Sequence, residues 1–352
     1  MKFKLGSKTV KSNKQPYFIA EIGVNFENNF QRAKKIIKLA KEGGADAVKF
    51  QSYKAEKIAC KNSPYYWDLK EVKVKSQYRL FKKFDKFGFK EFNLLKKYCD
   101  KLKIDFLSTP FDLEAVDYLD DLVPFYKVAS ADLTNYPLIK KICEKNKPIV
   151  LSTGASNQKE IYNVLKFIKK NNKKINVILL HCVLSYPTNN EDANLNLIKN
   201  FKKTFKNKII GYSDHTLPDE NMIILTKAYQ NGAWVIEKHF TDTKGLKGND
   251  HFHSIDKKDL IKFRKNIDLL NKIDGVSKKR EVLKSEKKSR INARRSIVAR
   301  NNISKGEKLS YNNLIMKRPG FGISPTKIFK VIGKTARKNI SEDSIINFKD
   351  II

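Results

Sequence analysis

The amino-acid sequence predicts an α/β fold, a (β/α)8 or TIM barrel, followed by a small β-rich domain. Before residue 275, eight short apolar runs rich in β-branched and aromatic residues alternate with segments whose apolar residues have helical spacing. Such alternation is typical of a parallel sheet covered by helices. Eight units in roughly 250 residues match the size of a (β/α)8 barrel. After residue 275 this alternation stops, which predicts a separate domain.

The eight expected strands are residues 17–23, 45–51, 105–110, 125–130, 148–154, 176–182, 209–215 and 234–241. Amphipathic helices are expected between them, for example at 30–44, 90–103, 136–146 and 158–172. An open doubly wound sheet is the competing fold, but no glycine-rich dinucleotide fingerprint follows the first strand.

One connection is longer than the others. Residues 52–89 separate the second strand from its apparent helix, and they contain Trp67 and several tyrosines. Because long connections in compact domains often serve as lids or binding loops, we expect this one to fold over a ligand.

The remainder of the chain changes character twice. Residues 276–290 are charged and lack strong apolar periodicity, so a linker is expected between a barrel at 1–275 and a domain at 291–352. In the last segment, short apolar runs are separated by the turn signals SKGE, RPGFG and SED. This pattern predicts a small, mostly β domain.

Composition excludes several classes of protein. Of the 352 residues, 41% are apolar, which is ample for a buried core and excludes disorder for most of the chain. No apolar run approaches the roughly 18–20 residues that a membrane helix needs, and no signal peptide is recognised at the N-terminus. Four cysteines without a Cys-x-x-Cys pair suit a reducing compartment. We expect a cytoplasmic protein without a membrane partner.

The net charge is strongly positive, with 72 basic and 37 acidic residues and a formal charge of +35. A nucleic-acid-binding protein is therefore one alternative, and the basic arm at 277–295 is its best candidate segment. The lysines, however, are spread over most predicted helices, as solvated faces are. The arm also lacks the aromatic residues on which bases stack. We expect anionic substrates and no nucleic acid.

Polar residues cluster where the predicted strands end, which is where the active site of a TIM barrel lies. They are Glu21, Lys49, Gln51, Ser108, Thr109, Lys127, Ser130, Ser152, Thr153, His181, Ser213, Asp214, His215, Glu237 and His239. Ionisable and hydroxyl groups at nearly every strand end indicate an anionic, oxygen-rich substrate.

Two groups of these residues suggest specific chemistry. His215 and His239 end consecutive strands, so they should be neighbours and suit a divalent cation; a hydrogen-bonded pair of histidines is the alternative, and His251 with His253 is the fallback metal site. Lys49 and Lys127 with nearby hydroxyls suit a phosphate or carboxylate. A Schiff-base lysine, as in a pyruvate aldolase, or simple ion pairing with Glu21 or Glu237 remain open.

Ordered motifs along the chain resemble the N-acetylneuraminate (sialic acid) synthase family, which includes legionaminate and pseudaminate synthases. The motifs are AEIGVN (20–25), VKFQ (48–51), STPFD (108–112), YKVAS (126–130), LSTG (151–154), HCVLSYPT (181–188), GYSDHT (211–216) and IEKHFT (236–241). ISKGE (303–307) and KRPGFGIS (317–324) resemble that family's antifreeze-like, or SAF, domain.

The resemblance implies a carbohydrate-biosynthetic transferase that condenses phosphoenolpyruvate with an N-acylated hexosamine, N-acetylmannosamine or a diacetamido analogue. The product would be a nine-carbon 2-keto sugar acid, formed with phosphate release by C–O cleavage. A divalent metal is implied, Mn2+ first, with Mg2+ or Co2+ as alternatives. The implied assembly is a domain-swapped homodimer.

The resemblance also implies roles for individual residues. His215 and His239 match metal ligands, and Glu21 and Glu237 are the candidates for proton transfer. Matches to phosphoenolpyruvate contacts are Lys49, Thr109, Lys127, Ser130, Ser152 and Ser213. Tyr186 and Asp250 match sugar-side positions, and Arg318 matches an arginine inserted into the partner subunit's site.

Four residues depart from the family pattern: Phe26, Asp132, Leu184 and Asn249. The positions matched to phosphate and metal are intact, whereas the altered ones are expected near the sugar. The motifs therefore define the type of reaction better than they define the sugar substrate. STPFD and AEIG are closer to the sialic and legionaminic branches than to the pseudaminic branch.

Overall fold

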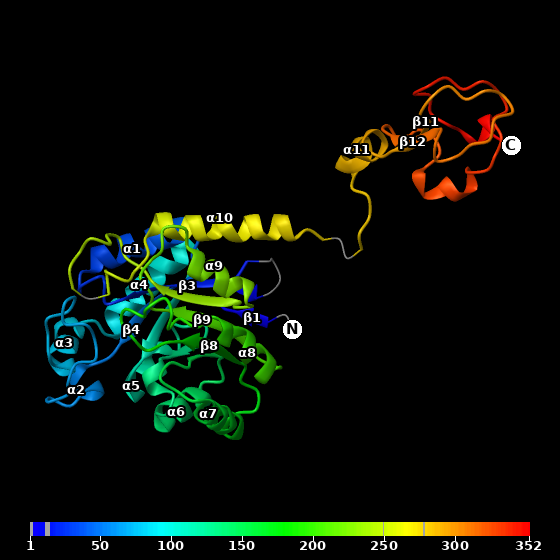
Figure 1. Cartoon of the computed structure of the whole chain (residues 1–352). Coiled ribbons are helices and arrows are strands. Elements are labelled where there is room, and N and C mark those ends of the chain that lie inside the picture. Colours follow the sequence, from blue (N-terminus) through cyan, green and yellow to red (C-terminus); the bar gives the residue numbers. More distant parts are fainter. Residues whose placement is uncertain (1–2, 11–14, 249, 277–278) are drawn as a thin grey trace. The chain divides into compact units, whose positions relative to one another are not determined.

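The computed structural model describes residues 3–10, 15–248, 250–276 and 279–352 (Figure 1). The chain divides into two compact units, Met1–Gly275 and Val276–Ile352. Asn249 and residues 277–278 of the expected linker lie outside the described residues.

Eight parallel strands form a nearly closed barrel in the first unit, which confirms the predicted fold. The strands are β3 (Tyr17–Gly23), β4 (Ala47–Ser52), β5 (Asp105–Pro110), β6 (Tyr126–Val128), β7 (Ile149–Ser152), β8 (Val177–Cys182), β9 (Ile209–Asp214) and β10 (Val235–His239). Their order in the sheet is β5-β4-β3-β10-β9-β8-β7-β6, and β5 also lies next to β6. The pairing of the first of these strands, β3, with the last, β10, brings the two ends of the barrel sequence together.

Helices follow the strands and cover the outside of the barrel. They are α1 (Phe30–Gly43), α4 (Phe89–Leu102), α5 (Leu113–Leu119), α6 (Tyr136–Glu144), α7 (Gln158–Asn171), α8 (Asn196–Thr204), α9 (Ile223–Gln230) and α10 (Lys257–Asp274). Their starts are marked by side-chain caps: Asn29, Asn157 and Asp256 each accept a hydrogen bond from the first turn.

Strand residues alternate between the helix-facing side and the barrel interior. On β4, Phe50 points outward and packs against Phe92 of α4 with a ring-centroid distance of 5.9 Å. Its neighbours Lys49 and Gln51 point the other way and line the interior cavity. The apolar half of each strand therefore holds the helices in place, while the other half is free to carry polar groups.

The connection at 52–89 is more ordered than a loop. It contains two short helices, α2 (Ala55–Ile58) and α3 (Gln77–Phe84), which the sequence analysis did not predict. A hairpin of β1 (Phe3–Leu5) and β2 (Lys8–Val10) also precedes the barrel. These elements are only three to eight residues long, too short for periodicity to identify them.

The second unit is built from short β segments around its own apolar core, as expected. Strand β11 (Ser296–Ala299) pairs antiparallel with β12 (Leu314–Lys317), and several isolated bridges extend the arrangement. The short helix α11 (Lys287–Asn292) precedes them, partly within the expected linker. No helix among the described residues of either unit is long and apolar enough to cross a membrane.

Candidate functional site

A cavity of about 440 Å3 opens at the carboxyl ends of the barrel strands. Twelve of the predicted site residues line it: Glu21, Lys49, Gln51, Thr109, Lys127, Ser130, Ser152, Tyr186, Ser213, His215, Glu237 and His239. Asp250 lines a smaller cavity that adjoins the first. Arg318 is exposed and lies in the second unit, directly after β12.

Register places the interior residues opposite one another. Glu21 lies beside Lys49 across β3 and β4 and beside His239 across β3 and β10, while Glu237 lies beside Ser213. The backbone enters the left-handed region at the end of β3, where Gly23 has φ of 54° and the β3–β4 register shifts after Glu21. A residue without a side chain suits that left-handed conformation.

Two lysines and two glutamates form a buried charge network inside the cavity. Lys49 Nζ lies 2.6 Å from Glu21 Oε2 and 3.8 Å from Glu237 Oε2, and Lys127 Nζ lies 3.6 Å from Glu237 Oε1. All four side chains are at most 7% exposed. Because an unpaired charge in such a place is costly, each ion depends on its neighbours.

The two glutamates differ in their pKa values. Burial raises the pKa of Glu21 to about 7, against the attraction of Lys49 and with the repulsion of Glu237. Burial also raises the pKa of Glu237, but Lys127 and Lys49 outweigh it and hold the value below its usual range. Near neutral pH, Glu21 is therefore the carboxyl group that can both accept and release a proton.

The pKa values of the two lysines also shift in opposite directions. Burial lowers the pKa of Lys49, but the carboxylates of Glu21 and Glu237 outweigh it and raise the value. Burial dominates at Lys127, so its pKa lies below the ordinary value. Lys49 also donates to the Thr109 hydroxyl over 2.9 Å.

Hydroxyl groups line the same side of the cavity as the lysines. Ser213 donates to Glu237 over 3.0 Å, and Ser130 accepts from the backbone N–H of Gly154 over 2.9 Å. A Cβ at Gly154 would lie 2.9 Å from the Ser130 hydroxyl oxygen, so glycine permits this close approach. The buried hydroxyl of Ser152 has no hydrogen-bond partner, which leaves it available to a bound oxyanion.

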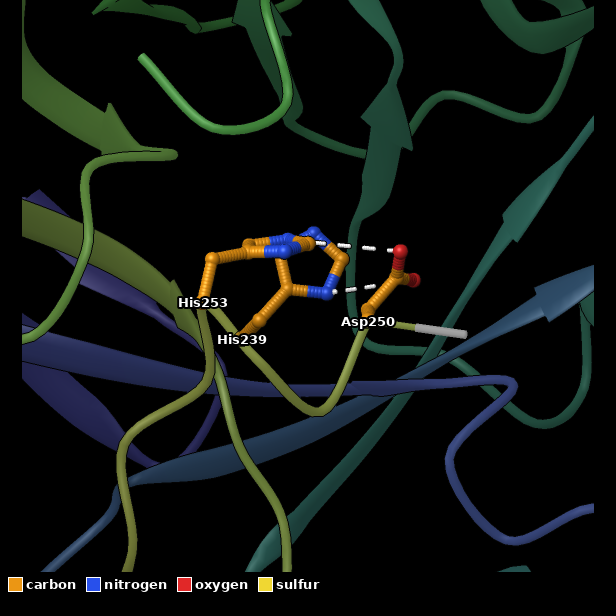
Figure 2. Close-up of side chains that lie close together, drawn as sticks. All are labelled: His239, Asp250 and His253. Carbon is orange, nitrogen blue, oxygen red and sulfur yellow. Dashed lines mark ion pairs between the residues drawn. The ribbon is translucent and has the colours of Figure 1, made fainter. Parts of the chain in front are cut away.

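Three histidines gather at the other side of the cavity. The ring centroids of His215 and His239 are 5.6 Å apart, and those of His239 and His253 are 4.5 Å apart. Figure 2 shows that the carboxylate of Asp250 lies beside His239 and His253, with its oxygens 3.4 Å from His239 Nδ1 and 4.0 Å from His253 Nε2.

This group has the composition of a metal site. One ligand atom from each of His239, Asp250 and His253 lies within 4.8 Å of the others. His239 Nδ1 and both ring nitrogens of His253 are buried without hydrogen-bond partners. Burial holds the pKa values of both histidines well below the usual range, so the rings are neutral and can donate a lone pair.

His215 is arranged differently from these two. Its Nδ1 lies 2.7 Å from the carbonyl oxygen of Val183 and 3.8 Å from Cys182 Sγ. A hydrogen bond from Nδ1 to the carbonyl leaves Nε2 as the lone-pair donor, an arrangement common among metal-binding histidines. His251, the other fallback residue, instead lies 2.7 Å from the Thr241 hydroxyl through its Nδ1.

Behind the histidines, a buried ion pair joins the ends of β9 and β10. Lys238 Nζ lies 2.7 Å from Asp214 Oδ2, and Asp214 also accepts hydrogen bonds from Tyr212 and Thr216. Asp214 was expected at the strand end with the other polar residues, but the structure turns it away from the cavity and into this pair.

Other residues were placed less well by sequence reasoning. His181 points away from the cavity, with its Nε2 2.8 Å from the carbonyl of Ala193, whereas Cys182 lines it. The two are neighbours in one strand, so their side chains point to opposite faces. Among the departures, Asp132 and Leu184 line the cavity, but Phe26 packs between Phe50 and Phe87 instead.

Fold and site together define a class of protein: a TIM barrel that presents buried lysines, hydroxyls and clustered histidines at its carboxyl-terminal face, followed by a small β domain. Comparison with known families gives the particular assignment. Residues 36–279 match the NeuB family and residues 294–352 match the SAF domain. The chain belongs to the NeuB family, the sialic-acid-type synthases, whose named members include legionaminic acid, pseudaminic acid and N-acetylneuraminate-9-phosphate synthases.

Individual relatives match over nearly the whole chain. An uncharacterized protein of Methanocaldococcus jannaschii is 41% identical over 352 residues, covering 100% of this chain and 99% of its own. The N,N'-diacetyllegionaminic acid synthase of Campylobacter jejuni is 41% identical. The match covers 95% of this chain and 99% of the synthase. A crystal structure of N-acetylneuraminic acid synthetase from Leptospira borgpetersenii, in complex with citrate, matches with a TM-score of 0.71 and 34% sequence identity. The match covers 82% of this chain and 95% of the synthetase.

Proposed function

We propose that the protein condenses phosphoenolpyruvate with an N-acylated hexosamine to form a nine-carbon 2-keto sugar acid and phosphate. The observation that carries the proposal is the pair of buried lysines, surrounded by hydroxyls, in one cavity with the histidine cluster. Family membership supports it, because named relatives make acids of this type. The reaction joins C3 of phosphoenolpyruvate to the sugar aldehyde carbon, adds water at C2 and releases phosphate by C–O cleavage.

In this proposal the anionic substrate binds at the lysines. Lys49 and Lys127 balance its phosphate and carboxylate charges, and Ser130, Ser152 and Thr109 donate hydrogen bonds. Charge-assisted hydrogen bonds in a buried cavity are stronger than in water, so these groups stabilise the charge that develops as phosphate leaves. The free hydroxyl of Ser152 supports this role.

Glu21 is the proton-transfer group of the proposal. Its pKa of about 7 lets it take a proton from the attacking water near neutral pH, whereas Glu237 is held ionised by two lysines. The sequence alone left the choice between these two residues open.

A divalent cation fits the histidine side of the cavity. His239 is common to both candidate ligand sets, the predicted His215 with His239 and the geometric group of His239, Asp250 and His253. The unpartnered buried nitrogens of His239 and His253 support metal binding. When bound, the cation would supply Lewis-acid polarisation of the sugar aldehyde. We propose Mn2+, with Mg2+ and Co2+ as alternatives.

Isotope labelling tests the reaction. In water enriched in oxygen-18, turnover of phosphoenolpyruvate with N-acetylmannosamine or its diacetamido analogue should place label in the keto acid and none in the phosphate. Label in the phosphate would contradict C–O cleavage. The low pKa of Lys127 keeps a pyruvate aldolase as the competing function. Borohydride added with pyruvate should leave the protein mass unchanged, whereas a lysine adduct would favour the aldolase.

The pH dependence of kcat/KM tests the role of Glu21. A general base must be ionised, so kcat/KM should fall about tenfold per pH unit below the pKa of about 7 and level off above it. Glu21→Gln should lower kcat by about 10²–10⁴-fold and remove this acidic limb. Glu237→Gln serves as the control and should keep the limb, moved to lower pH because the repulsion of Glu237 no longer raises the pKa of Glu21. An unchanged limb in Glu21→Gln would assign the ionisation to another group.

Direct Mn2+ binding tests the ligand assignment independently of activity. After chelation, free Mn2+ can be followed by its electron paramagnetic resonance signal. We expect His215→Ala and His239→Ala each to weaken binding at least about tenfold. His253→Ala should also weaken it, because its nitrogens have no other partner. Wild-type affinity in both His215→Ala and His239→Ala would place the metal elsewhere.

Subunit mixing tests the proposed domain-swapped homodimer, in which Arg318 completes the partner's site. Inactive Arg318→Ala and Lys127→Ala chains, mixed under subunit exchange, should form mixed dimers that each hold one intact site. Random exchange should then restore about a quarter of wild-type activity. If both variants are folded dimers and mixing restores none, Arg318 serves its own barrel or no site.

A further inference from the structure

Arg318 is the residue of the second unit on which the proposed function depends. The ladder between β11 and β12 ends at the pair Ser296–Lys317, so Arg318 is the first residue beyond it. Its side chain is exposed, and within the described part of the chain no hydrogen bond or ion pair holds its guanidinium. Its placement is therefore set by the backbone that follows, the turn at 319–322.

One buried hydroxyl spans this turn. Ser296 is the first residue of β11 and is completely buried. Its Oγ donates to the carbonyl oxygen of Pro319 over 2.6 Å and accepts from the backbone N–H of Gly322 over 2.8 Å. The hydroxyl therefore spends its one donor and an acceptor position on the two sides of the turn. It ties the backbone directly after Arg318 to a strand of the core.

The segment before β11 holds the same turn from a second direction. The backbone N–H of Gly320 donates to the carbonyl oxygen of Ile291 in α11 over 2.8 Å. A Cβ at Gly320 would lie only 2.9 Å from the Cβ of Arg294, so glycine permits this close approach. Arg295 adds a hydrogen bond from its Nη1 to the carbonyl of Met316 over 3.2 Å. The turn is therefore fastened both to β11 and to the segment before it.

We propose that Ser296 is a positioning residue, which with the carbonyl of Ile291 fixes the turn from which Arg318 reaches the hexosamine. The inference rests on the proposed function, which gives Arg318 its role. A turn that is fixed in advance loses less conformational freedom when its side chain meets a ligand, so less binding energy is lost to ordering. The end of the basic arm at 277–295 then serves to hold this turn.

Hydrogen–deuterium exchange of the full-length protein tests the structural half of the proposal without turnover. Ser296→Ala removes both hydrogen bonds to the turn, so the amides at 319–323 should exchange at least about fivefold faster, the factor for one typical hydrogen bond. Ser310→Ala is the matched control, because its Oγ also accepts from a turn N–H, that of Asn312 over 3.3 Å, ahead of β12. It should leave exchange at 319–323 unchanged. Wild-type exchange there in Ser296→Ala would overturn the proposal.

Steady-state kinetics of the same variants test the functional half. Ser296→Ala should raise KM for N-acetylmannosamine, or for its diacetamido analogue if that is the sugar turned over, about tenfold, because a displaced Arg318 meets the sugar less well. KM for phosphoenolpyruvate should not change, since its proposed contacts lie in the barrel. Ser310→Ala should match the wild type. A lower kcat with both KM values unchanged would mean that Ser296 only stabilises the second unit, contrary to the proposal.

Gly320→Ala is the second variant, for use if Ser296→Ala does not fold. It keeps Ser296 but forces the turn away from Arg294, so it should raise the same KM selectively; unchanged kinetics would contradict the proposal. Failure of the proposed function is distinguishable. Without turnover by the wild type that function is wrong, and the exchange data alone decide whether Ser296 holds the turn. Impaired Arg318→Ala beside unimpaired Ser296→Ala would overturn this inference alone.

Discussion

The charge network inside the barrel is the constraint on which the site depends. Glu21, Lys49, Glu237 and Lys127 are all nearly inaccessible to water, and burial costs several kcal/mol for each ion. They are tolerated because opposite charges alternate in space, with Lys49 shared between both glutamates. The two lysine side chains are therefore already desolvated and held in place. The same network separates the pKa values of its two glutamates. Near neutral pH, Glu21 can accept and release a proton, whereas Glu237 stays ionised.

Much of this could be predicted from the sequence, because a parallel barrel has few degrees of freedom. Apolar runs identified the eight strands, and strand order then placed His215 beside His239. Alternation along each strand explains why Lys49 and Gln51 face inward while Phe50 packs on a helix. The interior lining follows from these rules without any knowledge of side-chain contacts.

The rest depends on contacts that no local pattern contains. His253 and Asp250 lie in a loop after the last strand, so their approach to His239 follows from tertiary packing alone. Asp214 was expected in the cavity, but Lys238 on the neighbouring strand offers it a buried partner. Phe26 was expected near the sugar, yet aromatic neighbours on β4 and before α4 draw it into the core. In each case a partner distant in sequence decided between two permitted positions.

The two halves of the site are consequently built on different kinds of support. His215 and His239 stand at strand ends, and those ends are joined by the Asp214–Lys238 pair, whose lysine also donates to the carbonyl of Thr216. Sliding one strand against the other would break a buried ion pair, so the spacing of His215 and His239 is rigid. The wall of the smaller cavity beside His239 instead belongs largely to the connection at 52–89, which is held by ring packing and by hydrogen bonds from the Trp67 indole to backbone carbonyls. Such a wall can change without disturbing the strands. Within this fold, the spacing of His215 and His239 is therefore fixed by the barrel strands, whereas the lining that residues 52–89 contribute is not.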